Sequence, residues 1–142
     1  EVAAITREHE PVRRLMQING VGPLIASALY ALVGDARQYR NGRDLAVALG
    51  LTPRQHSSGG KEKLLGISKR GDKYVRTLLI HGARSALRTA PSRTDRISRW
   101  ALALAERSHP NVAVTALANK TARVAWAMLR HGANYEPERV AA

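Results

Sequence analysis

A tight turn between two helical patterns is set by residues 18–26, which read Ile18-Asn19-Gly20-Val21-Gly22-Pro23-Leu24-Ile25-Ala26. The glycines permit a sharp backbone reversal, and Pro23 suits the first turn of a helix. This order predicts a helix-hairpin-helix over about residues 12–34. Free N–H groups at the start of its second helix can hold a phosphate, so Gly20 and Gly22 are candidate nucleic-acid contacts. A turn that only packs two helices is the alternative, and the absence of Lys and Arg from residues 16–35 favours it.

Apolar residues recur at helical spacing on both sides of this turn. They predict a mostly α fold and a single domain over residues 1–142, in which the helix-hairpin-helix is followed by a helical bundle. A serine loop and basic helix are expected over about 51–89, and terminal helices over about 95–131. The residues after Gly132 are expected to form a tail. The individual helices are predicted over 1–17, 24–33, 41–49, 71–88, 95–107 and 111–131.

Positive charge is concentrated in one third of the chain. The 142 residues include 23 Lys and Arg against 11 Asp and Glu, which gives a net charge of +12. Twelve basic residues fall between Arg54 and Arg99, where only three acids oppose them. Such clustering predicts a phosphate-binding face whose affinity falls steeply with salt, so nucleic acid is the expected partner. A basic protein without such a partner is the alternative.

The composition argues against several classes of site. With no Cys, the chain has no disulfide, thiolate metal site or Cys nucleophile. The five His have no ligand spacing and the acids are not paired as in a two-metal nuclease, so no metal site is expected. No apolar run approaches the roughly 18 residues of a membrane span, and no signal peptide is visible. A cytoplasmic protein with no membrane partner is therefore expected.

The helix expected over residues 71–88 has an apolar side and a basic side. At 100° per residue, the apolar side is predicted to carry Val75, Leu78, Leu79, Ala83 and Ala86. The opposite side is predicted to carry a stripe of candidate phosphate contacts, Lys73, Arg76, Arg84 and Arg88. A basic turn before the helix adds the candidates Lys69 and Arg70. A solvated charged face without a ligand is the alternative for any single residue.

Residues 51–70 are the least regular part of the sequence and are expected to form one long irregular Ser/Gly loop. A short strand or hairpin around residues 63–68 is the alternative. The loop contains two serines beside two glycines, Ser57, Ser58, Gly59 and Gly60. Backbone N–H groups in such a loop can cradle a phosphate.

A serine in this loop is also a candidate nucleophile toward phosphorus. A hydroxyl is a weak nucleophile and needs a base or a strongly cationic setting. His56 is close in sequence, and the positive charge would come from Arg54, Lys61 and Lys63. An ordinary flexible Gly/Ser loop is the commoner occurrence, so spacing alone leaves the role of the serines open.

The order of these motifs resembles that of one protein family. The motifs are Gly20-Val21-Gly22-Pro23, Gly34-Asp35, Leu49-Gly50-Leu51-Thr52-Pro53-Arg54, Ser58-Gly59, Ser68-Lys69-Arg70-Gly71-Asp72 and Val75-Arg76. The late segment from Ala116 to Tyr135 is similar to the terminal helix of that family. The family is the carboxy-terminal domain of the IS one-ten and IS one-eleven-eleven class of insertion-sequence transposases, also described as bridge-RNA-guided recombinases.

The resemblance implies a DNA transposase that cleaves and rejoins strands during insertion-sequence transposition. The serine of the family's Pro-x-x-x-x-Ser-Gly pattern falls on Ser58, which would attack DNA and form a covalent phosphoserine link. Ser57 is the runner-up, and Gly59 and Gly60 would shape the loop. The resemblance places the magnesium cofactor in an amino-terminal RuvC-like domain that is absent from this chain, so none is expected here.

The resemblance also implies partners and a setting. DNA and a guide (bridge) RNA are the expected ligands, and the full-length protein is expected to be a homo-oligomer in the bacterial cytoplasm, associated with the nucleoid. Because the chain begins at Glu1 without Met, it is expected to be a fragment or a processed product. Without the RuvC-like domain it is expected to be inactive alone. Non-enzymatic readings are the alternatives, either a helix-hairpin-helix nucleic-acid-binding module or an RNA-binding accessory domain.

Overall fold

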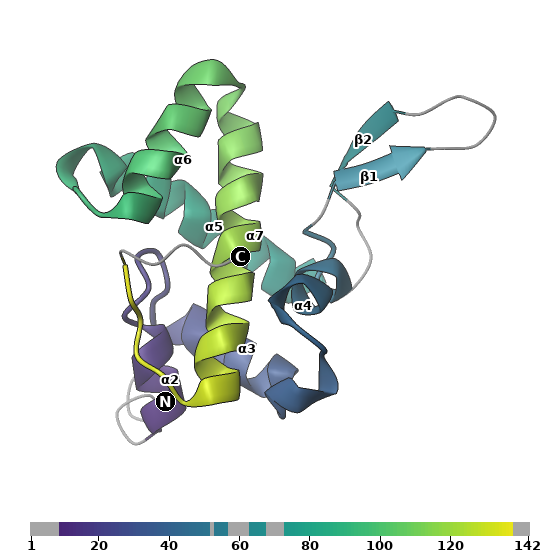
Figure 1. Ribbon diagram of the computed structural model, residues 1–142, viewed down its shortest axis with the longest axis vertical. Coiled ribbons are helices and arrows are strands. Elements are labelled where there is room, and N and C mark those ends of the chain that lie inside the picture. Colours follow the sequence, from purple (N-terminus) through teal and green to yellow (C-terminus); the bar gives the residue numbers. More distant parts are fainter. Residues whose placement is uncertain (1–8, 52, 57–62, 68–72, 138–142) are drawn as a thin grey trace.

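The computed structural model describes residues 9–51, 53–56, 63–67 and 73–137. Helices dominate these residues, which confirms the predicted mostly α fold (Figure 1). The helices and 3-10 turns are α2 (Glu10–Leu15), α3 (Pro23–Val33), η1 (Ala36–Gln38), α4 (Gly42–Ala48), α5 (Lys73–Thr89), η3 (Ala90–Ser92), α6 (Arg96–Arg107) and α7 (Pro110–His131). The two strands are β1 (Pro53–His56) and β2 (Lys63–Ile67).

The long helix α7 is the centre of the helical body. Figure 1 shows it along the long axis of the molecule, and α2, α4, α5 and α6 all contact it. Four of its alanines are fully buried, where their small side chains let a neighbouring helix approach closely; they are Ala113, Ala118, Ala122 and Ala125. At the closest approach, a Cβ atom added to Gly42 of α4 would lie 2.9 Å from the Cα atom of Arg123.

The turn predicted from the glycines lies between α2 and α3 and packs against α5. Gly20 has φ of 91°, a left-handed conformation that favours glycine. Its carbonyl oxygen is so close to α5 that a Cβ atom added to Gly82 would lie 2.4 Å from it. Gly22 has φ of −92° and caps α3, with Pro23 in the first turn as predicted. This contact with α5 agrees with a packing role for the turn, and the helix-hairpin-helix assignment stays a prediction.

The stretch expected to be one irregular loop contains a hairpin. β1 and β2 pair antiparallel, with Gln55 opposite Leu64 and His56 opposite Lys63. The alternative of a strand or hairpin around 63–68 is confirmed, and the expectation of irregular backbone throughout 51–70 is wrong for both strands. In Figure 1 the hairpin projects away from the helical body on the side of α4. Pairing across the ladder satisfies the backbone groups that an isolated segment would leave to water.

The described helices begin and end close to the predicted bounds, and two expectations fail. The side chains of Asn41 and Asp95 accept hydrogen bonds from the first turns of α4 and α6, as capping residues do. The helix predicted over 1–17 ends at Leu15, and residues 1–8 lie outside the described part of the chain. The expectation of a tail after Gly132 is wrong for the residues that follow it directly. There the side chain of Gln17 accepts a hydrogen bond from the backbone N–H of Tyr135 at 2.8 Å.

Candidate nucleic-acid interface

Helix α5 separates apolar from basic residues as its periodicity predicts. Four of the predicted apolar residues are buried in the core, Val75, Leu79, Ala83 and Ala86, and Leu78 is half-buried. Three of the four predicted cations are exposed on the other side, Lys73, Arg84 and Arg88. The helix therefore fixes these three side chains on a rigid backbone that is anchored along its apolar side.

Arg76 does not belong to this exposed stripe, which corrects the prediction. Its side chain is only 6% exposed, and its Nη1 atom lies 3.5 Å from the carbonyl oxygen of Leu49. At 100° per residue, Arg76 lies only about 20° around the helix from the buried Ala83, but about 80° from the exposed Arg84. Its long side chain therefore packs at the edge of the core, where the guanidinium reaches a backbone carbonyl.

Little negative charge opposes the exposed cations. Between Lys73 and Arg99 the sequence has seven basic residues and one acid, Asp95. Asp95 accepts hydrogen bonds from the backbone N–H of Ser98 at 3.1 Å, its hydroxyl at 2.8 Å, and Nε of Arg93 at 2.9 Å. Burial raises the pKa of Asp95, but these hydrogen bonds outweigh it and lower the pKa below the usual value. Within the described residues, no carboxylate lies at ion-pair distance from Lys73, Arg84 or Arg88.

The hairpin leaves the helical body from a segment that three helices hold in place. Leu51 is 1% exposed, and its backbone N–H donates to the carbonyl of Ala46 in α4 at 2.9 Å. Nδ2 of Asn119 in α7 donates to the carbonyl of Leu51 at 3.3 Å, and Arg76 in α5 reaches Leu49. The exposed face of α5 therefore begins beside the point from which the hairpin projects. The apolar spacing of α7 does not predict that Asn119 makes this contact, because its partner, Leu51, lies 68 residues earlier in the chain.

Only part of the predicted serine site lies within the described residues. Arg54 and Lys63 lie on β1 and β2, whose backbone is described. The remaining candidates in and after the hairpin lie outside the described residues, Ser57, Ser58, Gly59, Gly60, Lys61, Lys69 and Arg70. The five candidates at 57–61 fall between the end of β1 and the start of β2 in the chain. Their assigned roles stay predictions.

The two glycines of the turn have different surroundings. Gly20 is constrained by its positive φ and by the backbone of Gly82. An added Cβ atom at Gly22 would meet nothing within 4 Å, and its φ is accessible to any residue. The start of α3 is thus open around Gly22, and a substitution there changes the approach to the helix without straining the fold.

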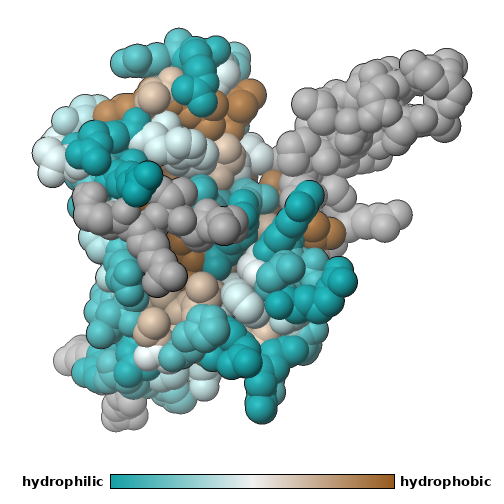
Figure 2. All heavy atoms as spheres, viewed as in Figure 1, coloured by the Kyte–Doolittle hydropathy of each residue, from teal (hydrophilic) through white to brown (hydrophobic). Residues whose placement is uncertain are grey.

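Sequence reasoning missed three further residues on the exposed side of α5. Tyr74, Thr77 and His81 are exposed between the predicted cations. The same 100° spacing places them on the face of Arg84 and Arg88, so a search for exposed residues of all types on this helix would have found them. Figure 2 shows hydrophilic residues over most of the visible face of the helical body, with hydrophobic atoms exposed in separate small areas.

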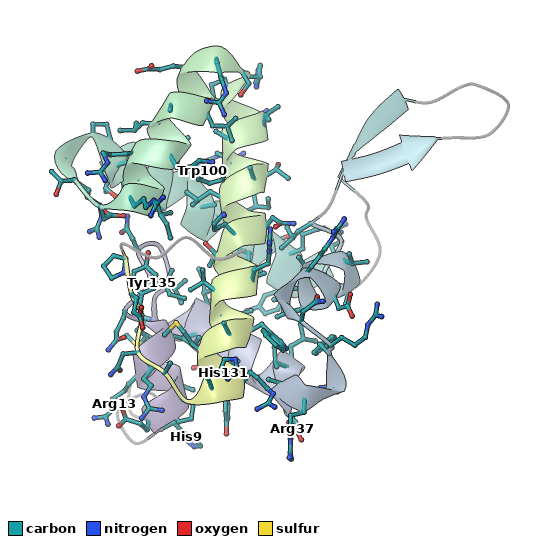
Figure 3. The ribbon with its side chains drawn as sticks, in the orientation of Figure 1. His9, Arg13, Arg37, Trp100, His131 and Tyr135 are labelled. Atoms are coloured by element: carbon teal, nitrogen blue, oxygen red, sulfur yellow. The ribbon has the colours of Figure 1, made fainter. Side chains whose placement is uncertain are left out.

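A small pocket lies where α6 and α7 meet α5 and the turn after α2, and its polar lining includes Asp95, Ser98, Lys120, Thr121 and Tyr135. Nζ of Lys120 lies 5.1 Å from the ring centroid of Trp100, a cation–π contact. Burial and the charge of Arg123 lower the pKa of Lys120 below its ordinary value. Figure 3 shows Trp100 on α6 and Tyr135 on the segment after α7. Lys120 is held by α6, whereas the cations of α5 face solvent.

The described part of the chain has neither a cluster of metal ligands nor a membrane-spanning helix. No three His, Asp or Glu side chains there come together as metal ligands would. None of its helices combines the length and the apolar character needed to span a bilayer.

Comparisons with known proteins point to one family. The sequence profile described as "Transposase IS116/IS110/IS902 family" matches residues 12–98, which include the turn, the hairpin and α5. Over 137 residues the chain is 50% identical to a "Probable family 20 transposase" of Pseudomonas aeruginosa, covering 96% of this chain and 40% of that protein. Over 135 residues it is 50% identical to the "Transposase for insertion sequence element IS1111A" of Coxiella burnetii, covering 95% of this chain and 37% of that protein. The chain thus spans about two fifths of the length of these curated relatives.

Proposed function

This chain belongs to the IS116/IS110/IS902 family of transposases, and on that basis we propose that it is a serine-bearing, nucleic-acid-binding domain of a DNA transposase. One observation carries the proposal. The helix α5 exposes Lys73, Arg84 and Arg88, with no described carboxylate at ion-pair distance, beside the segment from which the hairpin projects. A rigid row of cations suits the phosphates of a nucleic-acid backbone.

The proposed chemistry is attack by the hydroxyl of Ser58 on a DNA phosphorus atom. The Oγ–P bond forms as the Oγ–H bond and the bond from phosphorus to the leaving deoxyribose oxygen break, and the leaving oxygen takes up one proton in exchange for the one that the serine hydroxyl releases. The product is a phosphoserine link that a second hydroxyl can resolve by the reverse step. Ser57 is the alternative nucleophile. Positive charge near the hairpin would stabilise the negative charge that develops on the phosphoryl oxygens; the candidates are Arg54, Lys61, Lys63, Lys69 and Arg70.

The resemblance to the family also implies magnesium, which does not fit the residues described in this chain. Magnesium prefers carboxylate and other oxygen ligands, and no three Asp, Glu or His side chains come together there. On the resemblance to the family, we assign the metal to a RuvC-like domain elsewhere in the full-length protein. Binding of guide RNA, assembly into homo-oligomers and action at the bacterial nucleoid are part of the same proposal.

A non-enzymatic nucleic-acid-binding module is the second candidate function. One observation favours it: the exposed cations of α5 need nothing from the serine segment to contact a phosphate backbone. Under this alternative, the chain binds nucleic acid with or without Ser58 and no protein–DNA adduct forms in any assembly.

The two candidates are separated by a strand-transfer assay on the full-length protein with guide RNA, donor and target DNA and magnesium. We expect Ser58→Ala to lower strand transfer and covalent adduct at least about 100-fold, because it removes the nucleophile. DNA affinity, measured in parallel, is expected to stay within about twofold. Ser57→Ala is the matched control and is expected to retain activity. Activity that survives Ser58→Ala and is lost in Ser57→Ala would contradict the assignment, and an active wild-type protein without any adduct would contradict the serine mechanism.

A further inference from the structure

Tyr74 differs from every other aromatic residue of the chain. The sequence has four Tyr and two Trp and no Phe. Five of these six side chains pack against the hydrophobic core, Tyr30, Tyr39, Trp100, Trp126 and Tyr135. Tyr74 is 58% exposed, in the first turn of α5. The chain has few aromatic side chains and packs the other five at least partly against its core, yet it exposes this one on its cationic face.

The other exposed residues on the side of α5 that carries Tyr74 are polar or cationic. His81 and Arg88 follow it at intervals of seven residues, so the three lie along one side of the helix, within about 40° of one another. Thr77 and Arg84 lie beside this row and are exposed as well. At 1.5 Å per residue, the row from Tyr74 to Arg88 is about 21 Å long. The aromatic ring is at the end of the row that lies nearest the hairpin, since Arg76, two residues on, reaches Leu49.

An aromatic ring beside a row of cations is how many proteins bind unpaired nucleotides. Cations contact the phosphates, and the ring stacks on a base, which is worth about 1–3 kcal/mol per base. A base inside a duplex is already stacked on both sides and offers its face to no side chain. A cationic face without an exposed ring would hold a duplex as well as a single strand.

We propose that Tyr74 stacks on an unpaired base, so that the exposed face of α5 holds a single-stranded or locally opened stretch of nucleic acid beside the hairpin. The proposal rests on the proposed function, which makes nucleic acid the ligand of this face, and it adds the class of ligand. The aromatic ring supplies the preference for unpaired bases, and Arg84 and Arg88 supply the charge.

The test is the affinity of the chain for a fluorescent 12-nucleotide single strand and for the matching duplex, measured by anisotropy at several salt concentrations. We expect Tyr74→Ala to weaken single-strand binding about tenfold and duplex binding less than about twofold. Tyr74→Phe keeps the ring and is expected to stay within about twofold of wild type for both ligands. The salt slope of Tyr74→Ala is expected to equal that of wild type, because the substitution removes no cationic group.

Two controls separate stacking from a general effect on the surface. Val112→Ala shortens a side chain of similar exposure (50%) on α7 and is expected to change neither affinity. Arg88→Ala is expected to weaken both ligands together and to lower the salt slope by about one. The inference is overturned if Tyr74→Ala leaves single-strand affinity unchanged, if it weakens both ligands equally, or if Tyr74→Phe loses as much as Tyr74→Ala. A wild-type chain that binds neither ligand contradicts the proposed function itself.

Discussion

The two sides of α5 differ in their surroundings: one packs in the core and the other is exposed to solvent. One side packs against α3 and α7, with Gly82 in backbone contact with the Gly20 turn and Arg76 reaching the carbonyl of Leu49. The other side exposes Tyr74, Arg84 and Arg88. The packed side therefore determines the stability of the fold and the position of the hairpin base, whereas the exposed side is free to determine what the protein binds. Substitutions on the packed side should change stability and leave nucleic-acid binding unchanged. Substitutions on the exposed side should change binding and leave stability unchanged.

The largest effect is expected where the packed side of α5 contacts the turn. Gly82→Ala brings a Cβ atom within 2.4 Å of the carbonyl oxygen of Gly20, and the two backbones must move apart. We expect a loss of about 3 kcal/mol in the free energy of unfolding, measured by urea denaturation. Gly22→Ala is the matched control, because its Cβ atom enters open space, and should cost less than about 1 kcal/mol. Equal stability of the two variants would show that the contact between the turn and α5 is not close.

A smaller effect is expected at Arg76, the cation on the packed side. Arg76→Met keeps most of the side-chain volume but leaves the carbonyl of Leu49 without this donor, so we expect a loss of about 2 kcal/mol. Lys73→Met, on the exposed side, should change stability by less than about 0.5 kcal/mol. The salt dependence of nucleic-acid binding should show the reverse order. The slope of log affinity against log salt should fall in Lys73→Met and stay at the wild-type value in Arg76→Met. A salt slope that falls in Arg76→Met would place this side chain on the binding face after all.

The difference between the two sides also shows how far the sequence predicts the structure. Helical spacing alone predicted α5, the burial of Val75 and Leu79 and the exposure of Arg84, because a period of 3.6 residues separates the faces of any amphipathic helix. It failed at Arg76, which lies at the boundary. A side chain there can extend toward the core or toward solvent, and the carbonyl that it meets comes from a segment 27 residues earlier in the chain.

The candidate site was predictable to the extent that its chemistry is local. The cations of α5 follow from periodicity, and the Ser/Gly segment was identified from its own residues. The strand Pro53–His56 was missed, since a strand of four residues is stabilised by its partner rather than by its own pattern. Asn119 was missed for the same reason, because its contact with the hairpin base joins residues distant in sequence.

On the exposed side, the effect should appear in binding rather than in stability. Arg84→Ala combined with Arg88→Ala removes two exposed charges, and we expect nucleic-acid affinity to fall about tenfold or more at low salt. The slope of log affinity against log salt should fall by about two, with stability within about 0.5 kcal/mol of wild type. Arg13→Ala combined with Arg37→Ala removes two exposed arginines that each pair with a carboxylate and serves as the charge-matched control. Equal losses in the two double variants would mean that only net charge matters.

The smallest effect is expected at Asp95, the single acid between Lys73 and Arg99. Asn can still cap α6 with its side-chain oxygen, but it removes the negative charge that pairs with Arg93 and faces the start of α6, so Asp95→Asn should lower stability by about 1 kcal/mol at pH 7. Because the folded-state pKa of Asp95 is lowered, this contribution is complete above the unfolded-state pKa of about 4 and disappears as the pH falls through the folded-state pKa. Urea denaturation of both proteins between pH 7 and pH 2 should therefore show two curves that converge in acid. Glu106→Gln, at an exposed acid of the same helix, is the control and should keep stability at pH 7 within about 0.5 kcal/mol of wild type. A constant gap between wild type and Asp95→Asn from pH 7 to pH 2 would mean that the carboxylate's charge does not stabilise the fold.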